Sequence, residues 1–192
     1  EGQVVDAAIV DGVASMLTSM NALRTSGVFS TERGANVLDS GAYYYDTYVC
    51  GDGRYLAVGP IEKKFFAEFL DRLGLEPSDL PGQGDRARWP EGRATLAGIF
   101  ATRPRDEWVA LFADSDACVA PVLSMEESFD DPHLAGRGTY CEVDGYRQAA
   151  PAPKFSRTRP AVPEPPRQAD ARDALSDWLS DDEIEALAAA LA

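Results

Sequence analysis

The carboxylate of Glu62 occupies the position in this chain that most directly suggests chemistry. It follows a segment, 41–59, that predicts two strands joined by a tight turn, and it precedes a predicted helix whose apolar residues recur at helical spacing. A negative charge in the first turn of a helix is favoured by the helix dipole by roughly 0.3–1 kcal/mol. From spacing alone, this favourable charge at the helix entrance is the expected role of Glu62.

Histidine and cysteine are scarce in this chain. His133 is the single histidine, so the chain has no histidine cluster for a metal, and Cys50, Cys118 and Cys141 include no Cys-x-x-Cys pair. Three is an odd count, whereas small secreted domains stapled by disulfides carry denser, even sets. We therefore expect free thiols, a reducing cytoplasmic location, no metal, and a histidine on the surface or in a loop.

The elements that must position Glu62 are predicted from aromatic and turn residues. Tyrosines at 43–45 and the run at 48–50 favour strands, and Gly-Asp-Gly at 51–53 is a strong hairpin signal. Pro60 suits the first position of the helix that follows, and Gly74 ends that helix. The order strand, turn, strand and helix therefore places Glu62 at the point where the second strand gives way to the helix.

The remaining pattern predicts a small α/β (α+β) domain, in which a β-hairpin and short strands pack with helices. Helices are expected at 85–101 and 105–114, a buried strand at 117–123, and a hairpin about Asp144-Gly145. Linker helices and a C-terminal arm should flank this domain. The predicted division is 1–40 (a strand at 3–8 and a linker helix at 11–26), 41–148 (the small domain), 149–168 (a Pro-rich connector) and 169–192 (a helical arm).

Composition excludes several classes of function. The net charge of −14 argues against a nucleic-acid surface, which needs clustered lysine and arginine, and against binding to anionic membranes. No apolar stretch approaches the roughly 20 residues of a membrane span, and the acidic first residues are unlike a secretory signal. A predicted strand at the very start, with nothing to pair it, indicates a piece of a longer polypeptide.

Two long segments carry a resemblance to a known family. They are RGANVLDSGAYYYDTY at 33–48 and DGRYLAVGPIEKKFFAEFLDRLGL at 52–75. Four shorter motifs occur in the same order along the chain as in that family: GQVVDAA at 2–8, TRPRDEW at 102–108, DACVAPV at 116–122 and PAPKFS at 151–156. The chain resembles the C-terminal half of the α-methylacyl-CoA racemases, within the class III CoA-transferase superfamily. The resemblance covers roughly the whole chain.

The resemblance implies a proton-transfer reaction. Inverting the carbon beside a thioester requires that a proton leave one face and another arrive on the opposite face, so two acid–base groups are needed. In the family these are a histidine and an aspartate from the N-terminal half, and a glutamate of the smaller domain supports the histidine. Glu62, after Ile61, matches that glutamate. A carboxylate on the second imidazole nitrogen would fix the tautomer and raise the basicity of the histidine.

The resemblance also implies partners and a substrate surface. The family forms an interlocked homodimer, so Glu62 would serve a site whose other residues lie largely on the partner subunit. Leu38, Tyr45 and Ile61 correspond to positions near the acyl chain, although core or interface packing explains Leu38 and Tyr45 equally well. No cofactor is implied, because coenzyme A enters as part of the acyl-CoA thioester. Lys63-Lys64 departs from the Pro-Gln that often follows Ile-Glu in the family.

Three functional hypotheses remain open at this level. The first is the C-terminal part of a racemase acting on 2-methylacyl-CoA thioesters, inactive alone because the catalytic histidine and aspartate lie upstream. The second is a CoA-transferase of the same superfamily, since a shared fold does not fix the chemistry. The third is a non-catalytic dimerisation module, whose helix at 11–26 and C-terminal arm wrap a partner subunit.

Overall fold

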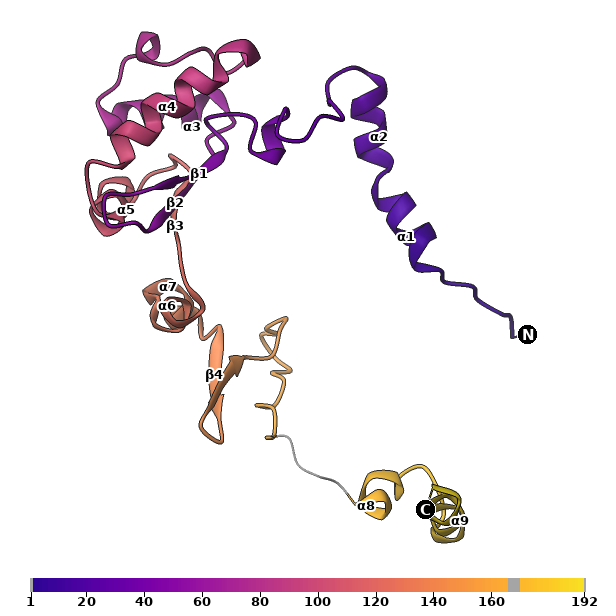
Figure 1. Ribbon diagram of the computed structural model, residues 1–192. Helices are drawn as coiled ribbons and strands as arrows, with labels where there is room; N and C mark the ends of the chain where they lie inside the picture. Colours follow the sequence, from indigo (N-terminus) through magenta and orange to yellow (C-terminus); the bar gives the residue numbers. More distant parts are fainter. Residues whose placement is uncertain (1, 166–169, 192) are drawn as a thin grey trace. The chain divides into compact units, whose positions relative to one another are not determined.

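A computed structural model describes residues 2–165 and 170–191. Its central element is the expected hairpin (Figure 1). Strand β1 (Asp46–Val49) pairs antiparallel with β2 (Tyr55–Val58), and Gly53 takes the positive φ of +78° that the turn requires. Strand β3 (Val119–Val122) pairs antiparallel with the other side of β2, which gives the order β1-β2-β3. Pro121 therefore lies on an edge strand, where its missing N–H is tolerated.

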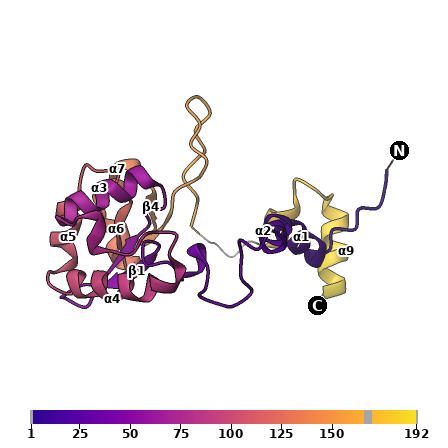
Figure 2. The same ribbon diagram turned by 90° about the horizontal axis from the view of Figure 1, so that it is seen from above.

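Three helices pack with this sheet in the unit that spans residues 1–123. They are α3 (Lys63–Leu73), α4 (Trp89–Phe100) and α5 (Arg105–Phe112). Two short 3-10 turns, η2 (Pro77–Asp79) and η3 (Arg86–Arg88), lie between α3 and α4, and a third, η1 (Val37–Asp39), precedes β1. Helix α4 lies beside β1 in both ribbon views (Figures 1 and 2). Residues 43–45, expected in a strand, form a turn before β1 instead: Tyr43 and Tyr44 are both buried and Tyr45 is exposed, so their side chains do not alternate as in a strand.

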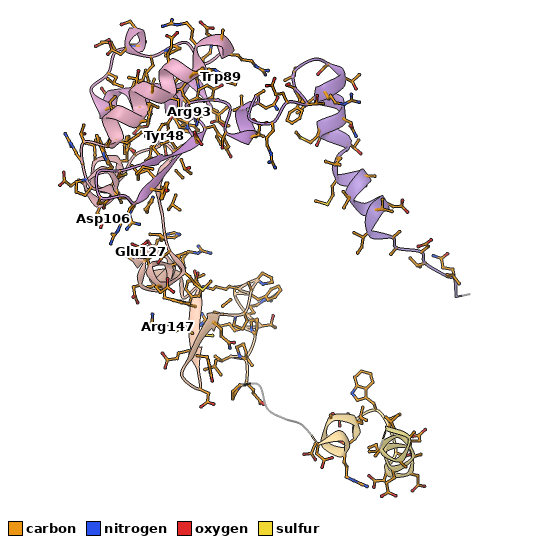
Figure 3. The ribbon with its side chains drawn as sticks, in the orientation of Figure 1. Tyr48, Trp89, Arg93, Asp106, Glu127 and Arg147 are labelled. Carbon is orange, nitrogen blue, oxygen red and sulfur yellow. The ribbon has the colours of Figure 1, made fainter. Side chains whose placement is uncertain are left out.

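Aromatic rings dominate the core of this unit. Phe69 of α3 stacks on Phe112 of α5 with centroids 5.7 Å apart, and Phe100 meets Trp108 edge to face at 5.3 Å. The backbone of α4 lies close to the Tyr43 ring at Gly92, where a Cβ would come within 2.6 Å of that ring. The buried aromatic residues are Tyr43, Tyr44, Tyr48, Phe69, Trp89, Phe100, Trp108 and Phe112. Figure 3 labels Tyr48 on the hairpin and Trp89 on α4.

The first residues differ from the expectation. The predicted strand at 3–8 is wrong: residues 2–8 form no strand, and no described segment pairs with them, so nothing satisfies the backbone groups that a strand would expose. The predicted linker helix is present as α1 (Ile9–Met16) and α2 (Thr18–Thr25), interrupted at Leu17. Neither helix buries a residue, and Met16 is 82% exposed.

The second unit spans residues 124–192. It contains α6 (Met125–Asp130), α7 (Pro132–Arg137), β4 (Tyr140–Val143), β5 (Tyr146–Ala149), α8 (Ala171–Leu175) and α9 (Asp181–Leu191). The expected hairpin about Asp144-Gly145 joins β4 and β5, with both residues at positive φ. Arg172 ties α8 to α9 through Asp181, at 2.5 Å, and Glu185, at 2.9 Å.

The mixture of helices with small antiparallel sheets confirms the predicted α/β class. The predicted division at 40, 148 and 168 stays a prediction, and its last boundary lies outside the described residues. Among the helices that the structure describes, none is long and apolar enough to cross a membrane.

Candidate functional site

The loop before β1 is held together by a network of hydrogen bonds around Asn36. This side chain is 3% exposed; its Oδ1 accepts from the Ser30 amide at 2.7 Å, and its Nδ2 donates to Asp39 Oδ2 at 2.8 Å. The Asp39 carboxylate also accepts from the Asn36 and Gly34 amides. Burial alone would raise the pKa of Asp39, but these hydrogen bonds outweigh it and hold that pKa below its ordinary value. This hydrogen-bond network fixes the position of η1, the turn that contains Leu38.

Glu62 occupies the N-cap position of α3, one residue before the first turn in which it was expected. Its side chain is exposed and makes no capping hydrogen bond. Within the part of the chain that the structure describes, Glu62 also forms no ion pair, and neither Lys63 nor Lys64 does. The structure therefore does not support a capping role through the side chain and leaves the carboxylate free to meet a group outside this unit.

The neighbourhood of Glu62 includes one thiol. Partial desolvation raises the pKa of Cys118, and the negative charge of Glu62 adds to that rise. A thiol held in its neutral form is a poor nucleophile. The backbone oxygen of Cys118 accepts from the Gly59 amide at 2.9 Å, so this residue helps to hold the segment that leads to Glu62.

An apolar cavity of about 330 Å³ lies between α2, η1 and the start of α3. Its lining residues are Met20, Leu23, Val28, Phe29, Asn36, Val37, Leu38, Ile61 and Arg86. The structure thus brings together two of the predicted substrate residues, Leu38 and Ile61, which are 62% and 38% exposed. Tyr45 lines a different cavity of about 320 Å³, together with Asp46 and Gly59.

Sequence reasoning missed three residues beside this cavity. Met20, on α2, lines the cavity wall with its side chain. Arg86 contributes the only cationic side chain among the lining residues and donates from Nη2 to the Val28 carbonyl at 2.8 Å. Gln83 donates to the two carbonyls just before Glu62. The sequence gives no periodic signal for Gln83 because it lies in an irregular loop.

The remaining candidates hold structural positions. Asp39 caps η1, and Asp46 pairs with Arg93 of α4 (Figure 3 labels Arg93). His133 is an exposed residue of α7, as expected of a surface histidine. No group of three or more potential metal ligands is found among the residues that the structure describes.

Comparison with known proteins places these features in a family. The description that matches residues 1–171 is "CoA-transferase family III". The chain is 42% identical over 164 residues to "Alpha-methylacyl-CoA racemase" of Mus musculus, and 37% identical to the Homo sapiens protein of that name. These matches cover 84% and 85% of this chain but only 42% and 43% of the relatives, so the chain spans less than half of their length.

A solved structure shows the same fold. It is a CAIB/BAIF family protein from Brucella suis, with a TM-score of 0.67 at 19% sequence identity. The match covers 96% of this chain and 48% of that one. Because the family description covers most of the chain, the conclusion is direct: this chain belongs to CoA-transferase family III.

Proposed function

We propose that this chain is the C-terminal part of a 2-methylacyl-CoA racemase and that Glu62 completes its proton-transfer site. The full-length protein would epimerise the carbon beside the thioester, with a histidine and an aspartate of the N-terminal half exchanging the proton. Glu62 would accept a hydrogen bond from the second imidazole nitrogen of that histidine. The identity to proteins named as racemases supports this reaction class.

The single observation that carries the proposal is the state of the Glu62 side chain. It lies exposed at the entrance of α3 and is not used by its own helix. A carboxylate that supports a histidine on a partner subunit must present this arrangement, since a side chain bonded within its own domain cannot reach across. Such a partner raises the pKa of the imidazole and keeps one ring nitrogen available to the substrate.

The cavity beside Glu62 fits the apolar part of the substrate. Leu38 and Ile61 contribute aliphatic surface to it, and Ile61 directly precedes the carboxylate. A branched acyl group bound against Ile61 would hold its α carbon near the acid–base groups, which is the geometric requirement of the reaction. Tyr45 would contact the acyl chain only from its separate cavity, so we expect a smaller contribution from it.

The test is exchange of the α proton for solvent deuterium by the full-length protein. Glu62→Gln keeps the shape of the side chain but removes its charge, so kcat should fall by roughly 10²-fold or more with little change in KM. Glu68→Gln on the same helix is the matched control, because its carboxylate only reaches Arg72 at 4.0 Å. Wild-type turnover in Glu62→Gln would refute the proposal.

Transfer of coenzyme A between acids is the second candidate, favoured by the name of the matching family. That reaction would pass through an acyl-aspartate anhydride on the full-length protein, which hydroxylamine cleaves to an aspartyl hydroxamate. Detection of the hydroxamate by mass spectrometry would favour transfer. Its absence, together with α-proton exchange, would favour epimerisation.

A non-catalytic role of the chain predicts association without chemistry. The exposed apolar residues of α1 and α2 are available for such contacts. The 192-residue chain alone should show no α-proton exchange under any of the three hypotheses. Exchange that appears only when an N-terminal half is added would support the racemase, whereas co-sedimentation without exchange would support a purely structural module.

A further inference from the structure

We propose that Gln83 is a positioning residue that aims Glu62, an inference that rests on the proposed function. The Gln83 carboxamide donates from Nε2 to the Pro60 carbonyl at 3.1 Å and to the Ile61 carbonyl at 2.9 Å. One amide group therefore binds two consecutive carbonyls immediately before Glu62. Because those two peptide units set the direction in which the chain enters α3, they set the position of the Glu62 Cα.

Gln83 is itself anchored to the aromatic core. Its backbone carbonyl accepts from Trp89 Nε1 at 2.9 Å and from the Tyr44 hydroxyl at 3.2 Å (Figure 3 labels Trp89). Two residues earlier, the Pro81 carbonyl accepts from the Tyr43 hydroxyl. Trp89 and Tyr43 are buried, so they hold this loop on a rigid base. The chain of contacts runs from the core through Gln83 to the segment 60–61.

The segment that carries Glu62 is also held from its other end. The Gly59 amide donates to Cys118 on the strand side, and the Ile61 amide donates to the Gly59 carbonyl at 2.9 Å. The first hydrogen bond of α3 joins the Phe66 amide to the Glu62 carbonyl at 2.9 Å. The backbone on both sides of Glu62 is thus held by hydrogen bonds, while its side chain makes no capping hydrogen bond in this unit. Such an arrangement delivers a group to a site completed by other residues.

Gln83 also fixes one wall of the apolar cavity. The carbonyl that it binds at 2.9 Å belongs to Ile61, whose side chain lines the cavity next to Leu38. A single carboxamide thereby couples the position of the acid to that of the acyl-chain wall. Loss of its two N–H donors should move both, and a misplacement of about 1 Å can cost roughly 10²-fold in rate.

Gln83→Met in the full-length protein tests this role, because it keeps the length of the side chain and removes both donors. We expect kcat for α-proton exchange to fall by roughly 10- to 100-fold. In a Glu62→Gln background the same substitution should cause a much smaller further loss of kcat, since most of its effect passes through Glu62 and only the displaced acyl-chain wall remains. Arg88→Met, in the same loop but paired with the exposed Glu91, is the matched control and should retain wild-type turnover.

A second variant and a second measurement do not depend on how well Gln83→Met folds. Gln83→Glu presents a carboxylate to two carbonyls, which raises the pKa of the new group, so its turnover relative to wild type should recover as pH falls and the group regains a proton to donate. In the 192-residue chain at neutral pH, amide hydrogen exchange of a peptide covering 59–66 should be faster in Gln83→Glu than in Arg88→Met.

The outcomes separate the two proposals. Unchanged turnover in Gln83→Met, or an equal further loss in the Glu62→Gln background, would overturn the role of Gln83 and leave that of Glu62 standing. Wild-type turnover in Glu62→Gln would instead remove the proposed function. Unchanged amide exchange in the peptide 59–66 would show that Gln83 does not fix this segment.

Discussion

Helices α3 and α6 both have an acidic residue at the N-cap or in the first turn, yet they use it in opposite ways. At α6, the Ser124 hydroxyl accepts from the Glu127 amide at 3.1 Å, and Glu127 Oε2 accepts from the Ser124 amide at 2.9 Å. This reciprocal capping box satisfies two backbone donors (Figure 3 labels Glu127). At α3, Glu62 stands at the N-cap and its side chain makes no such bond.

The difference separates a carboxylate that stabilises its own helix from one that is available elsewhere. At α3, the side chain of Gln83 and the Gly59 amide hold the backbone that leads into the helix. We therefore expect that the N-cap side chain is not needed for folding. The comparison therefore predicts that Glu62 matters for turnover and that Ser124 and Glu127 matter for stability. The following substitutions test this separation.

The largest effect is expected from Glu62→Ser, which should move activity and stability in opposite directions. Serine is a strong N-cap residue, so the free energy of unfolding should rise by up to about 1 kcal/mol as the hydroxyl binds a first-turn amide. Turnover of the full-length protein should fall by roughly 10²-fold or more. A variant that loses stability, or one that keeps its turnover, would break the comparison.

The next effect concerns Tyr43, whose hydroxyl bonds the loop that carries Gln83. Tyr43→Phe leaves the buried Pro81 carbonyl without this donor, and we expect a loss of about 1–3 kcal/mol in the free energy of unfolding. Urea denaturation of the chain measures it. A loss confined to urea denaturation, without faster amide exchange at 59–66, would show that the loop and the Glu62 segment are independent.

The same tyrosine predicts a dependence on pH. Burial, with a contribution from the charge of Tyr44, raises the pKa of Tyr43 from 10.0 to about 12. The folded state therefore holds this proton more tightly than the unfolded state. Its contribution to stability is complete below pH 10.0 and is lost as pH rises toward 12. Between those limits, stability should fall less steeply with pH in Tyr43→Phe than in wild type.

A moderate effect is expected at α6. Ser124→Ala removes the acceptor for the Glu127 amide, so the free energy of unfolding should fall by about 1 kcal/mol. Ser124→Thr, which keeps a hydroxyl, is the control and should lose less. Turnover of the full-length protein should be unchanged, and a fall in turnover would contradict the assignment of this helix start to folding alone.

The smallest effect is that of Glu62→Gln on stability. Because the side chain bonds nothing in its own unit, we expect the free energy of unfolding to change by no more than about 0.5 kcal/mol. Differential scanning calorimetry of the chain measures the change. A loss of 2 kcal/mol or more, on the order of that for a broken buried contact, would mean that Glu62 has a structural partner.

Local chemistry explains which elements could be predicted from the sequence. The hairpin turn needs a residue that tolerates positive φ, and Gly53 supplies it. Gly74 ends α3 because it also adopts a positive φ. The capping box at Ser124 and the turn at Asp144-Gly145 are also encoded within four residues. Glu62 was identified through a resemblance, because spacing alone favoured an electrostatic role at the helix entrance.

Features that depend on distant residues could not be predicted. The strand expected at 3–8 requires a neighbouring strand, and apolar residues alone do not reveal whether one is present. Tyrosines at 43–45 have strand propensity, but Tyr43 packs against Gly92 and bonds to Pro81, and Tyr44 bonds to Gln83. These two side chains turn inward, whereas Tyr45 stays exposed. Gln83 acts on residues more than twenty positions earlier, so no local pattern marks it.

The most direct test of the central claim is the pH dependence of α-proton exchange by the full-length protein. If Glu62 lends its charge to an imidazole, Glu62→Gln must lower the pKa of that imidazole, and the acid limb of the kcat/KM profile must move to lower pH, by about 1 unit or more. Glu68→Gln should leave the limb in place. A profile that keeps its acid limb in Glu62→Gln would contradict the account.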